Sequence, residues 1–230
     1  MKEILSNSTF FGVFISIVGY EVGVFFKKTF HKPIFNPLLI SIAFVMLFLL
    51  VCHIDYDSYN EGAKYLSYLL TPATVCLAVP LYQQIELLKK NVKAIIFGIM
   101  SGVFTSLSCI LLFSILFNFT HEQYVTLLPK SITTAIGMSV SEELGGIVTI
   151  TVAVIIITGV VGNMFAETVC KIFGIKDPIA KGIAIGTSSH AIGTAKALEM
   201  GRVEGAMSSL SIAVAGLITV IGASFFASIM

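Results

Sequence analysis

The sequence predicts an all-α, polytopic integral membrane protein. Of its 230 residues, 56% are hydrophobic and only 12% are charged, whereas soluble domains have about a quarter of their residues charged. The mean hydropathy is +0.96, and several apolar runs reach about 20 residues, the length that an α-helix needs to cross a bilayer. We expect about six full spans plus two broken or re-entrant helices, or eight spans if both polar segments cross.

Composition argues against several classes of function. The net charge is +1, and no basic run is interleaved with aromatic residues, so no nucleic-acid partner is expected. The four cysteines lie in or at the ends of apolar segments, without a Cys or His at zinc-ligand spacing. We therefore expect no metal site and no cofactor. The N-terminal run lacks an evident cleavage site and is interpreted as a retained first helix.

The first two spans are expected at about 8–26 and 34–52. Glu21 lies near the end of the first span, and three lysines follow it, as is typical of a cytoplasmic flank. The second span opens with Asn36-Pro37, where the first helical turn tolerates proline. An acidic loop without Lys or Arg follows and fits the outer face.

The third segment, at about 65–88, is interrupted by two prolines. Pro72 and Pro80 each remove a backbone donor and clash with the preceding turn. Together with Thr74 and a run of small residues, they predict a broken helix with freed carbonyl groups. Three lysines end the segment on the cytoplasmic side, and a plain span at about 94–118 follows.

A polar segment at 128–146 is too rich in hydroxyl and charged groups to face lipid. It contains a proline, Pro129, and precedes a strong span at about 147–170. Three lysines follow that span, and they would face outside if residues 128–146 crossed fully, against the positive-inside rule. We therefore expect this segment to enter the membrane, break near Pro129 and return.

The chain is organised around a second polar segment, 182–201, which reads GIAIGTSSHAIGTAKALEMG. Irregular backbone at membrane depth survives only inside protein or beside water, so we predict breaks at Gly186 and Gly193. The alternative is that small residues here only allow close helix packing, which the G-x-x-x-G spacing of Gly182 and Gly186 fits. His190 and Lys196 favour a functional site, because ionisable groups at this depth are usually functional. A last span is expected at about 206–230.

Two segments of the chain show a weak internal sequence similarity. LLTPATVCLAVPLYQQI and LLPKSITTAIGMSVSEEL share a leucine pair, an early proline, a threonine-rich patch and a small-residue middle. Corresponding proline- or glycine-interrupted segments in two halves of a chain point to the binding site of an inverted-repeat transporter. The similarity is short, and it favours a duplicated plan without proving one.

The polar segments suit a small carboxylate as ligand. Half-helix N-termini present free N–H groups and positive potential, and hydroxyl and cationic side chains add further donors. Lys130 is alternatively an interfacial anchor, and Lys196 alternatively pairs with Glu199. The candidate binding residues are Asn36, Thr74, Lys130, Ser131, Thr133, Thr134, Thr187, Ser188, Ser189, His190, Thr194 and Lys196.

Three carboxylates are candidates for proton coupling: Glu142, Glu143 and, more weakly, Glu21. Intramembrane carboxylates carry protons in coupled transporters. Glu142 and Glu143 are adjacent, so they point to different sides of a helix, and at least one of them fits a solvated helix end. No G-x-S-x-G or H-E-x-x-H pattern occurs, and we do not expect an enzyme.

The stretches NPLL, LLTPATVCLAVPLYQQ, LPKSITTAIGMSVSEELGG, KGIAIGTSSHAIGTAKALEMG and EGAMSSLSIAVAGL resemble the LrgB/CidB family. The resemblance covers nearly the whole chain and implies one transmembrane domain over residues 1–230. Ala135 stands where family members often carry a second proline. A second break in that element is therefore not implied.

The resemblance implies two functions. Bacterial members are described through control of murein hydrolases and cell lysis, in a holin/antiholin-like scheme with an LrgA/CidA-type membrane partner. Related plastid proteins move glycolate and glycerate, and some bacterial systems are linked to pyruvate. We therefore expect a transporter of small monocarboxylates in the bacterial inner membrane, with or without coupling to protons. The alternative is a non-transporting, holin-like regulator. A homodimer is the default expectation for an oligomer.

Overall fold

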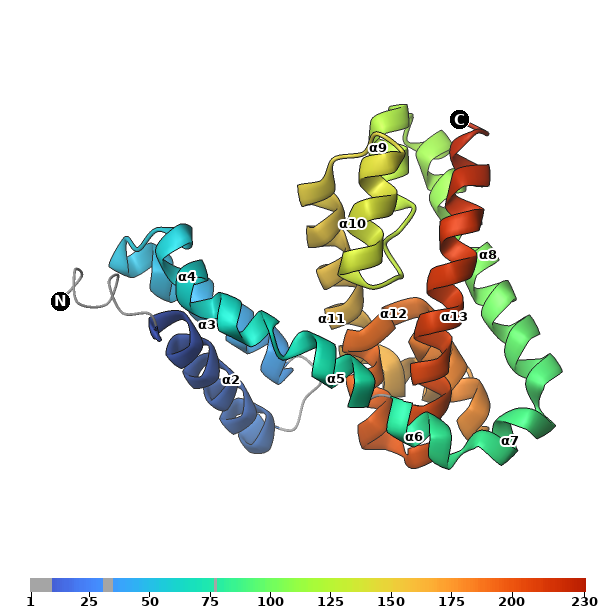
Figure 1. Cartoon of the computed structure of the whole chain (residues 1–230), viewed down its shortest axis with the longest axis horizontal. Helices are drawn as coiled ribbons and strands as arrows, with labels where there is room; N and C mark the ends of the chain where they lie inside the picture. Colours follow the sequence, from blue (N-terminus) through green and yellow to red (C-terminus); the bar gives the residue numbers. More distant parts are fainter. Residues whose placement is uncertain (1–9, 31–34, 77) are drawn as a thin grey trace. The chain divides into compact units, whose positions relative to one another are not determined.

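The computed structural model describes residues 10–30, 35–76 and 78–230, and all regular structure in these ranges is helical. The chain forms two compact units, residues 1–76 and 77–230. Each is described by itself (Figure 1). The prediction of a helical membrane protein is confirmed at this level.

The first unit is a small helical assembly. Asn36 begins α3, and its side-chain oxygen accepts hydrogen bonds from the N–H groups of Leu38 and Leu39. Glycines let α2 approach its neighbours, because Gly12 packs against backbone of α4 and Gly23 against Pro37. The helices are α2 (Phe11–Phe30), α3 (Pro37–Cys52), α4 (Tyr56–Ser67) and α5 (Leu70–Cys76).

The second unit contains three helices that are long and apolar enough to cross a membrane, within the described residues: α8, α11 and α13. Short helices and two polar elements surround them. The helices are α6 (Ala78–Gln83), α7 (Ile85–Lys90), α8 (Val92–Leu116), α9 (His121–Leu127), α10 (Thr134–Glu143), α11 (Val148–Ile172), α12 (Pro178–Met200) and α13 (Arg202–Ala227).

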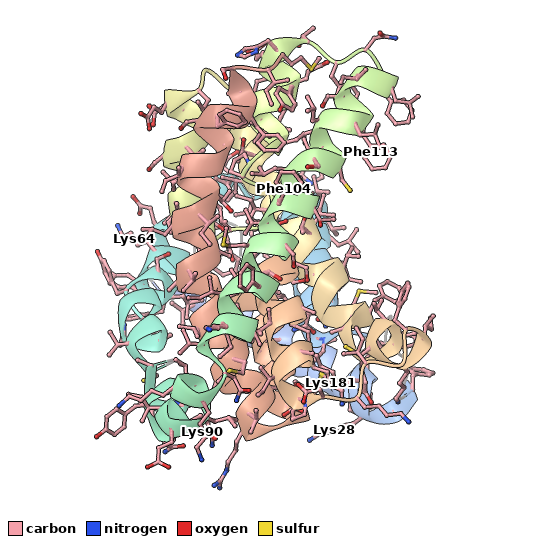
Figure 2. The ribbon with its side chains drawn as sticks, turned by 90° about the vertical axis from the view of Figure 1, so that its right-hand side faces the viewer. Lys28, Lys64, Lys90, Phe104, Phe113 and Lys181 are labelled. Atoms are coloured by element: carbon pink, nitrogen blue, oxygen red, sulfur yellow. The ribbon has the colours of Figure 1, made fainter. Side chains whose placement is uncertain are left out.

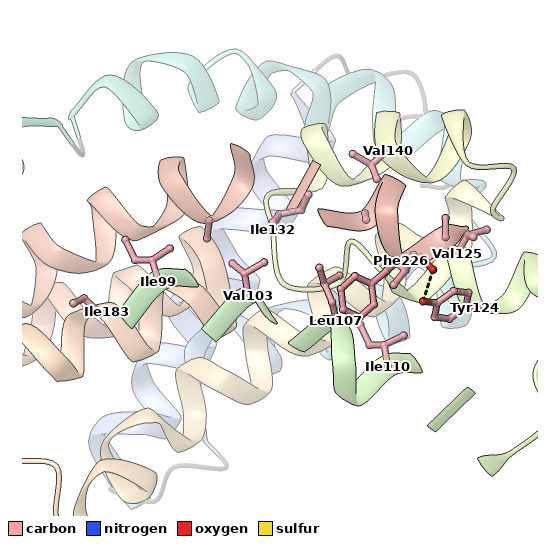
Figure 3. Close-up of a cluster of buried hydrophobic side chains, with 14 of the residues drawn as sticks. Ile99, Val103, Leu107, Ile110, Tyr124, Val125, Ile132, Val140, Ile183 and Phe226 are labelled. Carbon is pink, nitrogen blue, oxygen red and sulfur yellow. Dashed lines mark hydrogen bonds between the residues drawn. The ribbon is translucent and has the colours of Figure 1, made fainter. Parts of the chain in front are cut away.

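One face of α8 forms much of the core of this unit. Ile95, Ile99, Val103, Leu107 and Ile110 are buried at helical spacing. Figure 3 shows four of these side chains beside residues from α9, α12 and α13. The opposite face is apolar but exposed, as expected for a surface that contacts lipid.

The basic residues of the second unit gather at one end. Eight of its nine Lys and Arg residues lie where α8 and α13 begin and α11 ends: Lys89, Lys90, Lys93, Lys171, Lys176, Lys181, Lys196 and Arg202. In Figure 2, Lys90 and Lys181 lie toward this end, and Phe113 lies toward the other. The positive-inside rule predicts the cytoplasmic side for such a basic end. Lys130 is the exception.

The segment at about 65–88 was predicted as a broken helix. Its described residues lie at the end of α4 and in the short helices α5, α6 and α7. Pro72 and Pro80 are each the third residue of a helix, where a missing backbone donor costs little. The acidic region predicted as a loop is instead largely the amphipathic helix α4. A Thr120–Gln123 capping box begins α9, which was also not predicted.

Candidate functional site

Helices α9 and α10 form a hairpin that enters from the end opposite the basic residues. Thr126 on α9 lies level with the start of α11, because its hydroxyl accepts a 2.8 Å hydrogen bond from the N–H of Ile147. The chain then goes deeper through residues 128–133, which include Pro129, and α10 returns. The Ser141 and Thr151 hydroxyls lie 2.7 Å apart, and Gly137 packs on Ile155. Residues 128–146 therefore return to the end from which they start.

Helix α12 is also a hairpin, and it enters from the basic end. Its two arms, 178–189 and 191–200, pack against the same part of α13. Gly182 and Gly186 of the first arm contact α13 at residues 204–211. In the second arm, the Thr194 hydroxyl lies 2.7 Å from that of Ser208. The chain reverses at His190, whose φ of 42° and ψ of −141° are not helical.

The position of this break corrects the sequence-based prediction. Gly186 and Gly193 lie inside the two arms and not at a break. Both glycines serve close packing: a Cβ on Gly186 would lie 2.5 Å from the Ser208 carbonyl oxygen, and one on Gly193 would press on Ser189. The close-packing alternative is therefore correct for Gly186, Gly193 also serves packing, and His190 makes the turn.

The tips of the two hairpins meet near the middle of α8. The Ser131 hydroxyl lies 3.1 Å from that of Ser106, and Thr187 packs on Gly102. Gly102 and Ser106 are each ten residues, or about 15 Å, from one end of α8. We call the α9–α10 hairpin the outer hairpin and the α12 hairpin, which enters from the basic end, the inner hairpin. Figure 3 shows Ile132 of the outer hairpin and Ile183 of the inner hairpin in the same core cluster.

Contacts with α11 also indicate that the two hairpins reach the same depth, independently of their contacts with α8. Ile155 contacts Gly137 of α10 through its side chain. Its carbonyl oxygen accepts a 3.1 Å hydrogen bond from Nε2 of His190. The N-termini of α10 and of the second arm of α12 thus begin at similar depth and point toward the middle. First-turn N–H groups lack intrahelical partners, and each N-terminus carries positive potential.

The outer tip supplies the groups that best suit an anion. Lys130 is half-buried, and its ammonium donates a 3.1 Å hydrogen bond to Ser131 Oγ. No described carboxylate lies within ion-pair distance of it. Thr133 occupies the N-cap position of α10 without a side-chain capping bond. The hydroxyls of Thr133 and Thr134 make no hydrogen bond to any described residue and remain available as donors.

The hydroxyl groups at the inner tip already make hydrogen bonds within the protein. Thr187 donates to the Ile183 carbonyl at 2.7 Å, and Thr194 donates to the His190 carbonyl at 2.9 Å. A hydroxyl with its proton committed in this way can only accept further hydrogen bonds, so it is a poor carboxylate ligand. Ser188 and Ser189 pair with each other at 3.0 Å.

A cavity of about 500 Å³ lies between α8 and the first arm of α12. It extends from Asn91 and Asp177 at the basic end to Gly102 and Thr187 near the tips. Its volume falls in the range of small-molecule pockets. The cavity therefore reaches from the surface to the level at which the two hairpins meet.

The other predicted site residues lie away from the tips. Glu142 and Glu143 are exposed at the far end of α10, eight or nine residues beyond its start. Lys196 lies at the basic end and pairs with Glu167 at 3.4 Å and Glu199 at 3.3 Å. The pairing with Glu199 was the alternative considered from sequence.

Three predicted residues belong to the first unit. Asn36 caps α3. Glu21 is exposed on α2. Thr74 lies on α5, and its side chain falls outside the described residues.

Sequence reasoning missed three residues that hold the tips in place. Ser106 contacts Ser131, Ile155 contacts His190 and the first turn of α10 at Gly137, and the Asn163 amide donates a 2.6 Å hydrogen bond to the Ile192 carbonyl. Of these, only Asn163 carried a signal, as an amide within an apolar span. Ser106 and Ile155 are ordinary residues of apolar helices, and only tertiary structure reveals their contacts.

The chain matches known proteins over most of its length. A model of the LrgB-like family matches residues 16–229. Two relatives from two strains of Staphylococcus epidermidis, each named "Holin-like protein CidB", are 39% identical over 209 residues. The alignments cover 90% of this chain and 90% of each relative. No solved structure matches the chain significantly.

Proposed function

The chain belongs to the LrgB-like family, and from this premise we propose that it transports small monocarboxylates across the bacterial inner membrane. Substrates of the glycolate, glycerate, pyruvate or lactate type fit the proposal. The anion binds where the two hairpin tips meet, beside Lys130 and the N-terminus of α10. Its movement is coupled to protons.

One observation carries the proposal: the middle of the second unit concentrates positive potential without a carboxylate to balance it. Lys130 and two helix N-termini converge there. Each acidic residue of this unit lies toward one end or the other, at positions 86, 122, 142, 143, 167, 177, 199 and 204. A bound carboxylate supplies the missing charge and accepts hydrogen bonds from N–H and hydroxyl donors.

The arrangement of the hairpins supports movement across the membrane as well as binding. Two hairpins enter from opposite ends, and their tips meet near half-depth beside α8. Many secondary transporters bind substrate near the midplane between broken helices. Displacement of one hairpin at a time exposes the same site to alternate sides.

The direct test is uptake of labelled glycolate, pyruvate and lactate into liposomes that contain only this chain. We expect saturable uptake that increases when a proton gradient is imposed. Saturable uptake without a response to the gradient retains transport and removes proton coupling. Absence of uptake for all three substrates contradicts the proposal for the chain alone.

Lys130→Gln tests the site itself. A hydrogen bond to a charged group contributes about 1.5–3 kcal/mol, so we expect uptake at low substrate concentration to fall by about tenfold or more. Lys93→Gln is the matched control, because it removes the same charge from the basic end of α8. Equal uptake by wild type and Lys130→Gln rules out this role for Lys130.

The names of the relatives favour a second candidate function. A holin-like regulator acts through oligomerisation, in this case with an LrgA/CidA-type membrane partner, and it needs packing surfaces but no anion site. Uptake by the chain alone supports transport. Uptake that appears only after the partner is added supports a two-component transporter, and no uptake in either case supports the regulator.

A further inference from the structure

A second large cavity, of about 550 Å³, opens at the basic end of the second unit. It lies between the end of α11, both ends of α12 and the start of α13. Four lysines and three glutamates contribute to its lining: Lys171, Lys176, Lys181, Lys196, Glu167, Glu199 and Glu204. The cations exceed the carboxylates by one, and a cleft with an excess of positive charge raises the local concentration of anions.

This basic cavity leads toward the inner tip. Cys170 and Ile175 line it and also line a smaller cavity of about 210 Å³ between α11 and the first arm of α12. Ser188 and Ser189 line the smaller cavity and directly precede the turn at His190. The two cavities therefore adjoin at these shared residues, and the smaller one extends to the level of the break.

One ion pair crosses the basic cavity. Lys196, on the second arm of α12, lies 3.4 Å from Glu167 on α11. Glu167 also pairs with Lys171 at 3.0 Å, and Lys196 pairs with Glu199, but each of these contacts lies within one helix. Among ion pairs with both members described, Glu167–Lys196 is the one that joins two helices.

We propose that the basic cavity is the inner mouth of the transport route for small carboxylates, and that the Glu167–Lys196 pair is the latch that closes it. The proposal rests on the transport function. An incoming carboxylate replaces Glu167 as the partner of Lys196, so the ammonium remains paired throughout. The second arm of α12 is then released from α11 at its base.

The Glu167–Lys196 ion pair is weak enough to open and close during transport. The side chains of Lys196 and Glu167 are 21% and 47% exposed, and partly exposed pairs contribute little to stability. Loss of the pair therefore shifts an open–closed equilibrium by up to about fivefold. A deeply buried pair would resist opening far more strongly.

The native thiol of Cys170 is a suitable reporter, because it is 4% exposed and lines both cavities. The other three cysteines are replaced by alanine, and inverted membrane vesicles expose the basic end to an uncharged, membrane-impermeant maleimide. An uncharged reagent is needed because the substitutions alter local charge. We expect Glu167→Gln and Lys196→Gln each to raise the labelling rate by up to about fivefold.

Two further variants make the test specific. Lys171→Gln removes the same charge and also a partner of Glu167, but it leaves the link between helices intact, so labelling should be unchanged or slower. The exchange Glu167→Lys with Lys196→Glu should restore slow labelling. Labelling rates that are equal in wild type, Glu167→Gln and Lys196→Gln overturn the latch.

The labelling result is separate from the transport result. Labelling requires only opening of the cavity, whereas uptake requires the complete cycle. Wild-type uptake with unresponsive labelling rejects the latch and keeps the transporter. Responsive labelling without wild-type uptake rejects the transporter and, with it, the role of the cavity as a substrate mouth.

Discussion

Replacement of His190 separates its structural role from its chemical role. Its backbone has a φ of 42° and a ψ of −141°, a conformation that glycine adopts readily and residues with a Cβ adopt at a cost. Glycine and alanine both remove the imidazole and its 3.1 Å hydrogen bond to Ile155. The two variants therefore differ in how well they tolerate the turn and in the entropy of the unfolded chain.

The magnitude follows from the backbone geometry. In a continuous helix, alanine is about 1 kcal/mol more favourable than glycine. At His190 a Cβ costs about 1–3 kcal/mol, against about 0.4–1 kcal/mol gained by alanine through the unfolded chain. His190→Gly should therefore be more stable than His190→Ala by about 1 kcal/mol. The order is the reverse of helix propensity.

The chain contains no tryptophan, so thermal unfolding in detergent is best followed by far-UV circular dichroism. A difference of about 1 kcal/mol corresponds to about 2–4 °C in Tm. A higher Tm for His190→Ala than for His190→Gly would refute the turn at this residue. Uptake then addresses chemistry: normal uptake by His190→Gly limits His190 to making the turn, whereas loss of uptake in this folded variant requires the imidazole.

Three further substitutions test the packing that positions the hairpins, each by the change in Tm. Thr126→Val removes the acceptor for the N–H of Ile147 and should cost about 1–3 kcal/mol, because the N–H is left unpaired; an unchanged Tm would contradict this contact. Gly186→Ala places a methyl group 2.5 Å from the Ser208 carbonyl oxygen and should cost about 1–3 kcal/mol, whereas wild-type stability would mean that the arm packs less closely on α13. Tyr124→Phe removes a buried 3.0 Å hydrogen bond to α13 and should cost about 1 kcal/mol without changing uptake, so a loss of uptake would place Tyr124 in the transport route.

The sequence predicted the long helices well because they are set by local patterns. The predicted spans at 94–118, 147–170 and 206–230 correspond to α8, α11 and α13 within a few residues. The return of residues 128–146 followed from the positions of three lysines. These predictions rest on hydropathy and charge, which sequence states directly.

The break in the second polar segment was assigned to the wrong residues. Glycine is the usual residue at an irregular turn, and the segment contains several glycines. In the structure Gly186 serves close approach to α13, and Gly193 serves close approach between the two arms of α12. The turn occurs at His190, whose side chain is held by α11 from a distant part of the sequence. Tertiary contacts therefore overrode the local preference, and no local pattern distinguishes the two uses of glycine.

The candidate site was predicted in part for the same reason. Sequence identified Lys130 and the hydroxyl groups of both tips, but it could not distinguish free hydroxyls from those bound to their own helix, as Thr187 is. It also grouped Lys196 with the tips, although the structure places that residue six positions beyond the break, at the basic end. Such distinctions depend on which helix each side chain faces.

The energetic cost of Lys130 bears on the choice between transporter and regulator. A lysine near the centre of a membrane helix costs about 3 kcal/mol on insertion scales. Here the ammonium has a serine hydroxyl as its hydrogen-bond partner among the described residues. A protein that acts only by packing gains nothing that offsets this cost, and an apolar residue would serve it better. In the proposed transporter, a carboxylate bound beside Lys130 would offset the cost during each cycle, and this balance is the reason for preferring the transport proposal over a purely structural role.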